Sequence, residues 1–226
     1  MKERSLKLIQ PVSKRDQVVA SFKEAILSGV IQPGEPVVES KVAQQLGAGI
    51  PLVREALIEL EYQGYVQKVP YKGTTVTRLE RWDVDKIFRL RVELEAMAIE
   101  WAKEWVSPAD IEELRGITEK MKEGAQALNL ELFYQNDLAF HRKLWEMSGN
   151  EYLVECLERI VVPLFAFFLM KDRRPRESYL VSVAQHEKIL EALPKLSGAK
   201  LRALMRGSIS NWRTEIFSAV LPKDKD

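Results

Sequence analysis

Apolar residues recur every three or four positions along most of the chain, a spacing typical of amphipathic helices. In the N-terminal third this spacing predicts three short helices, over residues 17–27, 39–46 and 50–63. Ser13 is placed to cap the first of them, and a glycine follows each one. Two runs rich in β-branched residues, 65–69 and 74–77, then flank a turn and predict a β-hairpin. Three helices followed by a hairpin, over about residues 10–78, indicate a winged helix-turn-helix.

The rest of the chain shows helical spacing alone, without a convincing strand pattern. The expected helices cover residues 83–104, a segment that opens at Ser107 and Pro108, and residues 131–147, 151–170, 178–193 and 199–219. Short connections between helices favour antiparallel neighbours, so about six helices should form an antiparallel bundle. The predicted fold class is therefore mainly α, with a winged helix-turn-helix domain over residues 1–78 and a helical bundle over residues 79–226.

The second helix of the helix-turn-helix has one apolar face, formed by Val53, Ala56, Leu57 and Leu60. Arg54 lies off that face, in the first turns of the helix, and is expected to point to solvent. An exposed arginine near the start of a second helix is suited to contact base edges or phosphates in a major groove. Residues 1–78 carry eleven Lys and Arg against eight Asp and Glu, a net charge of +3, which is modest for a DNA-binding domain.

Two histidines and a carboxylate form the clearest candidate chemistry in the bundle. Asp137 and His141 stand four residues apart and therefore share one helix face, and His186 lies in the middle of a later helix. Carboxylate and neutral imidazole are suitable ligands for a divalent metal such as Zn²⁺, Ni²⁺ or Mn²⁺. The alternative is structural, with Asp137 and His141 as a surface pair and His186 as a hydrogen-bonded core residue.

Composition narrows the class of protein further. Cys156 is the one cysteine, so no intrachain disulfide can form, and its apolar surroundings in the sequence predict a buried position. The longest apolar run, residues 160–170, contains a proline and is too short to span a bilayer. Residues 1–4 lack the apolar core of a signal peptide, so a cytoplasmic protein is expected. The basic loop over residues 171–176 is expected to be solvated.

A series of spaced motifs resembles the GntR family of bacterial transcription regulators, in its FadR-like branch with an all-helical effector domain of the FCD type. The matching residues are Glu39-x-x-Val42-Ala43, Leu46-Gly47, Val53-Arg54-Glu55-Ala56-Leu57, Leu60-Glu61-x-x-Gly64-Tyr65-Val66 and Gly73-x-x-Val76. The resemblance implies a regulator that binds an operator in double-stranded DNA. The DNA-contacting positions it implies are Ser40, Gly49, Ile50, Pro51, Arg54, Lys72 and Gly73. Here Ile50 and Gly49 stand where family members carry an arginine and a serine.

The second domain resembles the FadR-like effector domain in Asp137-x-x-Phe140-His141-x-x-Leu144, Ser148-Gly149-Asn150, His186-x-x-Ile189-x-x-Ala192-Leu193 and Arg91-x-x-Leu94-Glu95. The resemblance implies a homodimer that senses a small organic acid, with Asp137, His141 and His186 as metal ligands. It also implies effector contacts from Arg91, Asn150 and Ser208. Metal-binding members carry a histidine where this chain has Ser208, so the expected site has three protein ligands completed by water or an effector oxygen.

Three interpretations of function stay open at this point. The first is a dimeric, ligand-responsive transcription regulator without a membrane partner. The second is a metal-dependent hydrolase or lyase that uses the Asp137, His141 and His186 group, although the sequence shows no nucleophile motif and no general base for it. The third is a sensor that has lost specific DNA binding, which Ile50 and the low basicity suggest. Arg91 likewise has two interpretations. It could simply form an ion pair with Glu95, or its guanidinium could bind an effector carboxylate through two hydrogen bonds.

Overall fold

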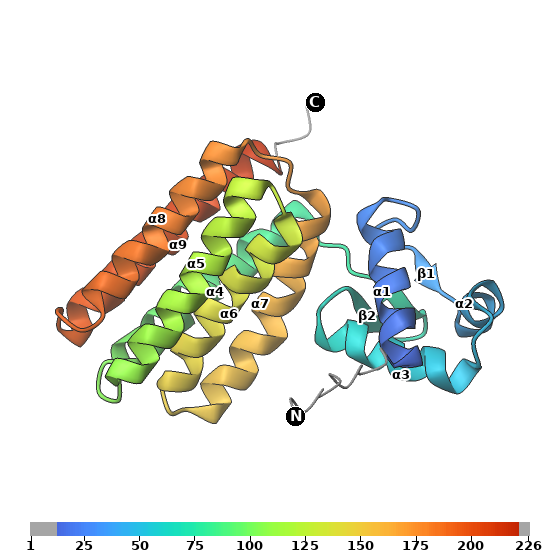
Figure 1. The fold of residues 1–226 in the computed structure, drawn as a ribbon, viewed down its shortest axis with the longest axis horizontal. Coiled ribbons are helices and arrows are strands. Elements are labelled where there is room, and N and C mark those ends of the chain that lie inside the picture. Colours follow the sequence, from blue (N-terminus) through green and yellow to red (C-terminus); the bar gives the residue numbers. More distant parts are fainter. Residues whose placement is uncertain (1–12, 222–226) are drawn as a thin grey trace, which may run out of the picture. The chain divides into compact units, whose positions relative to one another are not determined.

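A computed structural model of the chain describes residues 13–221 (Figure 1). Residues 1–12 and 222–226 lie outside the described residues. The predictions for residues 1–4 and for the first positions of the N-terminal module fall on these residues. The described chain divides between Thr77 and Arg78 into two compact units. The mainly helical fold class predicted from the sequence is confirmed, because a small sheet accompanies the N-terminal helices and the second unit is all helical.

Over the described residues 13–77, the first unit contains three helices and a three-stranded antiparallel sheet. Its elements are α1 (Lys14–Leu27), β1 (Pro36–Val37), α2 (Glu39–Leu46), α3 (Ile50–Tyr62), β2 (Val66–Val69) and β3 (Gly73–Val76). The Ser13 hydroxyl accepts the N–H of Asp16 at 3.0 Å, so the predicted cap is present, although α1 begins three residues earlier than expected. α2 ends at Gly47, whose φ of 60° is a left-handed conformation that glycine adopts without strain.

The hairpin of β2 and β3 is the predicted wing, and α1 packs against α3 beside it. The sheet order is β1-β3-β2, so β1 lies at the edge and pairs with β3 through Pro36 opposite Thr75. β1 was not predicted, because two residues give no alternation of polar and apolar positions. The core of this unit is formed by side chains such as Phe22, Val53 and Leu60.

The second unit is a bundle of the helices that the sequence predicted, with boundaries within a few residues (Figure 1). These are α4 (Arg81–Ala102), α5 (Pro108–Ala127), α6 (Leu130–Met147), α7 (Glu151–Lys171), α8 (Arg176–Ala192) and α9 (Gly198–Ala219). α4 packs against α6, α7 and α9, while α5 packs against α6 and α8, and α8 against α9. Four helices, α4, α6, α8 and α9, therefore come together around one interior region.

Two local features hold the bundle helices in place. The hydroxyl of Ser107 accepts the N–H of Asp110 at 3.2 Å, and the Asp110 carboxylate accepts the N–H of Ser107 at 2.9 Å, so α5 starts at a capping box. Where α5 meets α6, a Cβ at Gly124 would lie 2.6 Å from the backbone nitrogen of Phe133. Glycine at this position lets the two helices approach closely.

Two sequence predictions about the bundle are wrong. Cys156 is exposed, because its position on α7 faces away from the buried stripe of that helix. The loop after α7 is not fully solvated, because the guanidinium of Arg174 is buried and bonds the carboxylates of Asp172 and Glu215 at 2.8 and 2.7 Å. Among the residues that the structure describes, no helix is long and apolar enough to cross a membrane.

Candidate functional site

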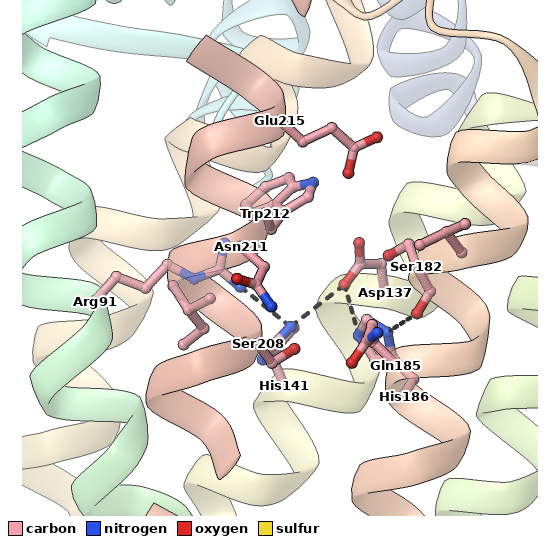
Figure 2. A pocket seen from close by; sticks show the side chains of 12 residues that line it. Arg91, Asp137, His141, Ser182, Gln185, His186, Ser208, Asn211, Trp212 and Glu215 are labelled. Atoms are coloured by element: carbon pink, nitrogen blue, oxygen red, sulfur yellow. Dashed lines mark hydrogen bonds and ion pairs between the residues drawn. The ribbon is translucent and has the colours of Figure 1, made fainter. Parts of the chain in front are cut away.

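A cavity of about 200 Å³ lies in the bundle where α4, α6, α8 and α9 meet (Figure 2). α4 contributes Arg91, and α6 contributes Asp137 and His141 from one face, as their four-residue spacing requires. The residues contributed by α8 and α9 are Val181, Ser182, Gln185, His186, Ser208, Ile209, Asn211, Trp212 and Glu215. The cavity is thus charged on the side of α4 and α6 and carries mainly uncharged hydrogen-bonding groups on α8 and α9.

Asp137 lies between the two histidines, as Figure 2 shows. Its Oδ1 atom is 3.1 Å from Nε2 of His186 and 3.4 Å from Nε2 of His141. One ligand atom from each of the three residues can be chosen so that all lie within 4.8 Å of one another, and all three residues are buried. The structure therefore brings together the three residues that the sequence named as candidate metal ligands.

The other ring nitrogen of each histidine is held by an acceptor. Nδ1 of His186 lies 2.8 Å from the carbonyl oxygen of Ser182, and Nδ1 of His141 contacts a carboxylate oxygen of Glu95. Carbonyl and carboxylate oxygens only accept, so Nδ1 carries the proton in both rings. Nε2 is then the nitrogen of each ring that faces Asp137. Metal-binding histidines are oriented in this way by acceptors behind them.

Arg91 forms the ion pair with Glu95 that was one of its two interpretations, and it also lines the cavity. Its side chain is 1% exposed and forms an ion pair with Glu95, which is equally buried. A second nitrogen, Nη2, lies 3.1 Å from Nε2 of His141, and the guanidinium lies 4.8 Å from the ring centre of Trp212. The third nitrogen, Nη1, is buried without a hydrogen-bond partner. A buried donor without a partner is costly, so Nη1 is available to an oxygen of a bound molecule.

The buried carboxylates are held in their charged form. Burial raises the pKa of Glu95, but the charges of Arg91 and His141 outweigh it and bring the pKa down to about 2. Burial also raises the pKa of Asp137, and His186 and His141 outweigh it, so this pKa lies well below its ordinary value. Burial lowers the pKa of His141, but the carboxylates of Glu95 and Asp137 together raise it above its ordinary value. Asp137 therefore presents an anionic carboxylate oxygen between the two imidazoles.

The candidate effector residues do not all reach this site. Arg91 and Ser208 line the cavity, but Asn150 does not. The side-chain oxygen of Asn150 accepts the N–H of Leu153 at 3.0 Å, so this residue caps the start of α7. Asn150 is thus a helix cap, and the structure does not bring it to the other two.

Several cavity residues were missed by sequence reasoning, among them Asn211, Trp212 and Glu215 on α9. They stand three, four and seven positions after Ser208 and so share its helix face. That spacing was the signal that could have identified them. The contact of Glu95 with His141 was also missed, because nothing local in the sequence indicates how α4 crosses α6.

The candidate DNA-binding residues lie on α2, the turn before α3, the start of α3 and the wing. All seven are exposed, namely Ser40, Gly49, Ile50, Pro51, Arg54, Lys72 and Gly73. Gly49 precedes α3 without a side-chain cap, and Pro51 occupies its first turn, where a missing N–H costs nothing. Arg54 is exposed as predicted, but it is not free, because its guanidinium bonds the carboxylate of Glu39 at 2.8 Å.

Comparison with known proteins identifies both units. Residues 14–76 match the family described as bacterial regulatory proteins, gntR family, and residues 86–211 match the FCD domain. The chain belongs to the GntR family. This GntR-family chain is 30% identical over 151 residues to the HTH-type transcriptional regulator McbR of Escherichia coli K12, an alignment covering 67% of this chain and 68% of McbR. The HTH-type transcriptional repressor RspR of the same species is 23% identical over 205 residues, which are 90% of this chain and 88% of RspR.

Solved structures show the same fold. The structure of Escherichia coli McbR/YncC aligns with a TM-score of 0.70 and 24% identity over 92% of this chain and 99% of that one. A GntR transcriptional regulator from Rhodococcus sp. RHA1 aligns with a TM-score of 0.69 and 18% identity, with the same shares covered. The family assignment makes this chain a transcription regulator with an FCD effector domain, and its relatives point away from the hydrolase or lyase interpretation.

Proposed function

We propose that this GntR-family regulator binds operator DNA as a homodimer and that its bundle cavity binds a small organic acid together with a divalent transition metal ion. The observation that carries the metal proposal is the convergence of Asp137, His141 and His186. The regulatory role is inferred from the family, and the kind of ligand is inferred from the residues that line the cavity.

The residues present fit a divalent metal ion. Two imidazole nitrogens and a carboxylate oxygen are a donor set that Zn²⁺, Ni²⁺ and Mn²⁺ accept. Glu95 and the carbonyl of Ser182 fix both imidazoles in the tautomer that offers Nε2. The side chain of Ser208 contributes little as a fourth ligand to these metals, because a neutral hydroxyl is a weak donor. When bound, the ion would supply a positive charge beside Arg91.

An organic acid suits the remaining polar groups of the cavity. Nη1 of Arg91 can donate to a carboxylate oxygen, and the ligand's anionic charge is favoured by Arg91 and by a bound divalent ion. Gln185, Ser208 and Asn211 can bind further oxygen atoms of the molecule from the opposite side. Glu215 also lines the cavity, but Arg174 neutralises it at 2.7 Å. The cavity volume of about 200 Å³ limits the ligand to a small molecule.

Regulation requires the ligand to bind two conformations of the protein with different affinities. α9 is the element suited to report binding, because Ser208, Asn211, Trp212 and Glu215 all project from it into the cavity (Figure 2). A ligand that binds both the α9 side chains and the group of Asp137, His141 and His186 would favour the conformation in which α9 lies close to α6 and α8. We propose that this conformation and the one without ligand differ in operator affinity.

Native mass spectrometry and elemental analysis of the full chain test the metal directly. The expected result is one Zn²⁺, Ni²⁺ or Mn²⁺ per chain, which His186→Ala loses and the cavity-lining control Gln185→Ala retains. A wild-type chain that takes up none of the three ions in titration overturns the metal proposal. DNA binding is then measured with and without lactate, malate and citrate, and an affinity that none of them changes counts against the organic-acid proposal.

A further inference from the structure

The exposed face of α3 carries two isoleucines in the region where a second helix of this motif meets base edges. Ile50 is 43% exposed and Ile58 is 57% exposed, and both lie on the same side of the helix as Arg54. α3, all of which the structure describes, carries one arginine against three glutamates. That arginine is engaged by Glu39 of α2. The face therefore offers methyl and methylene groups where readers of guanine offer cationic donors.

The chemistry of the major groove determines what such a face can recognise. Base edges there present hydrogen-bond donors and acceptors and a single apolar group, the C5-methyl of thymine. An isoleucine pressed against a guanine or cytosine edge would remove polar atoms from water without giving them a partner, which is unfavourable. The same isoleucine against a thymine methyl buries apolar surface on both sides, which is favourable.

We propose that Ile50 and Ile58 read thymine methyl groups in the operator, so that this regulator selects thymines by apolar contact. The proposal rests on the DNA-binding function proposed above and names the base class that it recognises. Eight residues separate the two side chains, which is about 12 Å along a helix axis. Since successive base pairs rise about 3.4 Å, the two thymines should lie three or four base pairs apart in each half-site.

Cations that could position the protein on the phosphates are carried by the elements that neighbour α3, namely α2 and the hairpin. Lys41 on α2 and Lys72 at the tip of the wing are both exposed. Phosphate contacts supply affinity and orientation without sequence information, whereas base contacts supply specificity. On this basis the two lysines would contact the DNA phosphates, and Ile50 and Ile58 would contact the bases. Few cations also predict a shallow dependence of affinity on salt concentration.

The test uses the full chain and a selection from a random duplex library, followed by affinity measurements on the enriched duplex. Each thymine is replaced in turn by deoxyuridine, which pairs identically but lacks the methyl group. Two positions, three or four base pairs apart, are expected to weaken binding about fourfold each, the effect of one buried methyl group. Ile50→Ala and Ile58→Ala should each make one of these positions insensitive to the replacement.

Val30→Ala is the matched control, because Val30 is a 75% exposed aliphatic residue outside α2, α3 and the hairpin. It should keep the full thymine dependence, and all variants should keep the wild-type melting temperature. An enriched duplex that tolerates deoxyuridine everywhere, or Ile variants that retain full discrimination, overturns the inference and leaves DNA binding intact. A library from which no sequence is enriched overturns specific DNA binding itself, and the inference with it.

Discussion

The guanidinium of Arg54 on α3 is bonded to the carboxylate of Glu39 on α2, with Nη2 2.8 Å and Nε 3.2 Å from the same oxygen. This hydrogen-bonded pair lowers the pKa of Glu39 and raises that of Arg54. It also joins the two helices of the helix-turn-helix across the turn at Gly47. The sequence predicted an exposed arginine but not its partner, which lies fifteen residues away. Arg54 therefore has a structural contact besides any contact that it makes with DNA.

Replacing Arg54 by alanine should weaken operator binding about ten- to a hundredfold, as expected for loss of a charge-assisted contact to a base or phosphate. Glu39→Gln separates this role from the structural one, because it keeps the side-chain size and removes the competing charge. We expect Glu39→Gln to bind as well as wild type or more tightly in anisotropy titrations at matched salt. If both variants lose affinity equally, Arg54 acts by holding α2 to α3.

Helix positions were predictable because they depend on local signals. Ser13 and the Ser107–Asp110 capping box mark helix starts by short-range hydrogen bonds that a sequence displays directly. Arg174 shows where such reasoning ends. A run of basic residues after a helix ordinarily faces water, but Arg174 is buried because it pairs with Asp172 and with Glu215 on α9, which is far away in the chain.

In the candidate site, too, some features follow from local spacing and others depend on how the helices pack. The four-residue spacing of Asp137 and His141 put them on one face, whereas bringing His186 to them depended on family resemblance. The pairing of Arg91 with Glu95 followed from spacing too, but its approach to His141 depends on how α4 packs against α6. Sequence patterns report the face of a helix, and the crossing of helices decides which faces meet.

The regulator should be a two-fold homodimer that reads a near-palindromic site, because one winged helix makes too few contacts for high affinity. Light scattering of the full chain should give twice the chain mass of 26.0 kDa at micromolar concentration. Titration with a selected duplex should then saturate at two chains per site. A particle of one chain mass that stays so after DNA is added would contradict the dimer and the symmetric operator together.

The capping box at the start of α5 should make stability depend on pH. Hydrogen bonds from Lys143 and from Ser107 bring the pKa of Asp110 down from 3.8 to about 2. Because the folded-state pKa lies below the unfolded one, the stabilisation is complete above about pH 4 and is lost as the pH falls toward 2. Asp110→Asn should therefore cost about 1 kcal/mol at pH 6. The cost should shrink below pH 4.

Urea unfolding of wild type and variant between pH 3 and pH 7 measures this difference. Glu112→Gln serves as the control, because Glu112 lies in the same helix but its side chain is 71% exposed, so its ion pair contributes little. A gap between wild type and Asp110→Asn that stays constant across this range would show that ionisation of Asp110 is not what stabilises the helix start.

The position of Ser208 gives the sharpest test of the metal site. Ser208 lines the cavity with Asp137, His141 and His186, and its hydroxyl is a weak donor beside two imidazoles. Ser208→His should add a fourth strong ligand and tighten the binding of Zn²⁺ and Ni²⁺. Because the ion binds the folded state, the variant should also melt at a higher temperature when metal is present, by about 1.4 kcal/mol of extra stability per tenfold gain in affinity.

Competitive metal titrations and melting curves, with and without Zn²⁺, check both effects. Ser208→Ala is the matched control and should bind metal like wild type, because removing a weak donor costs little. Adding His186→Ala to Ser208→His should abolish the gain, since the two histidines must share the ion. If Ser208→His binds Zn²⁺ no more tightly than Ser208→Ala, α9 does not face the three ligands closely enough to complete their coordination. The effector would then be held by Arg91 and the α9 side chains without a metal ion between them.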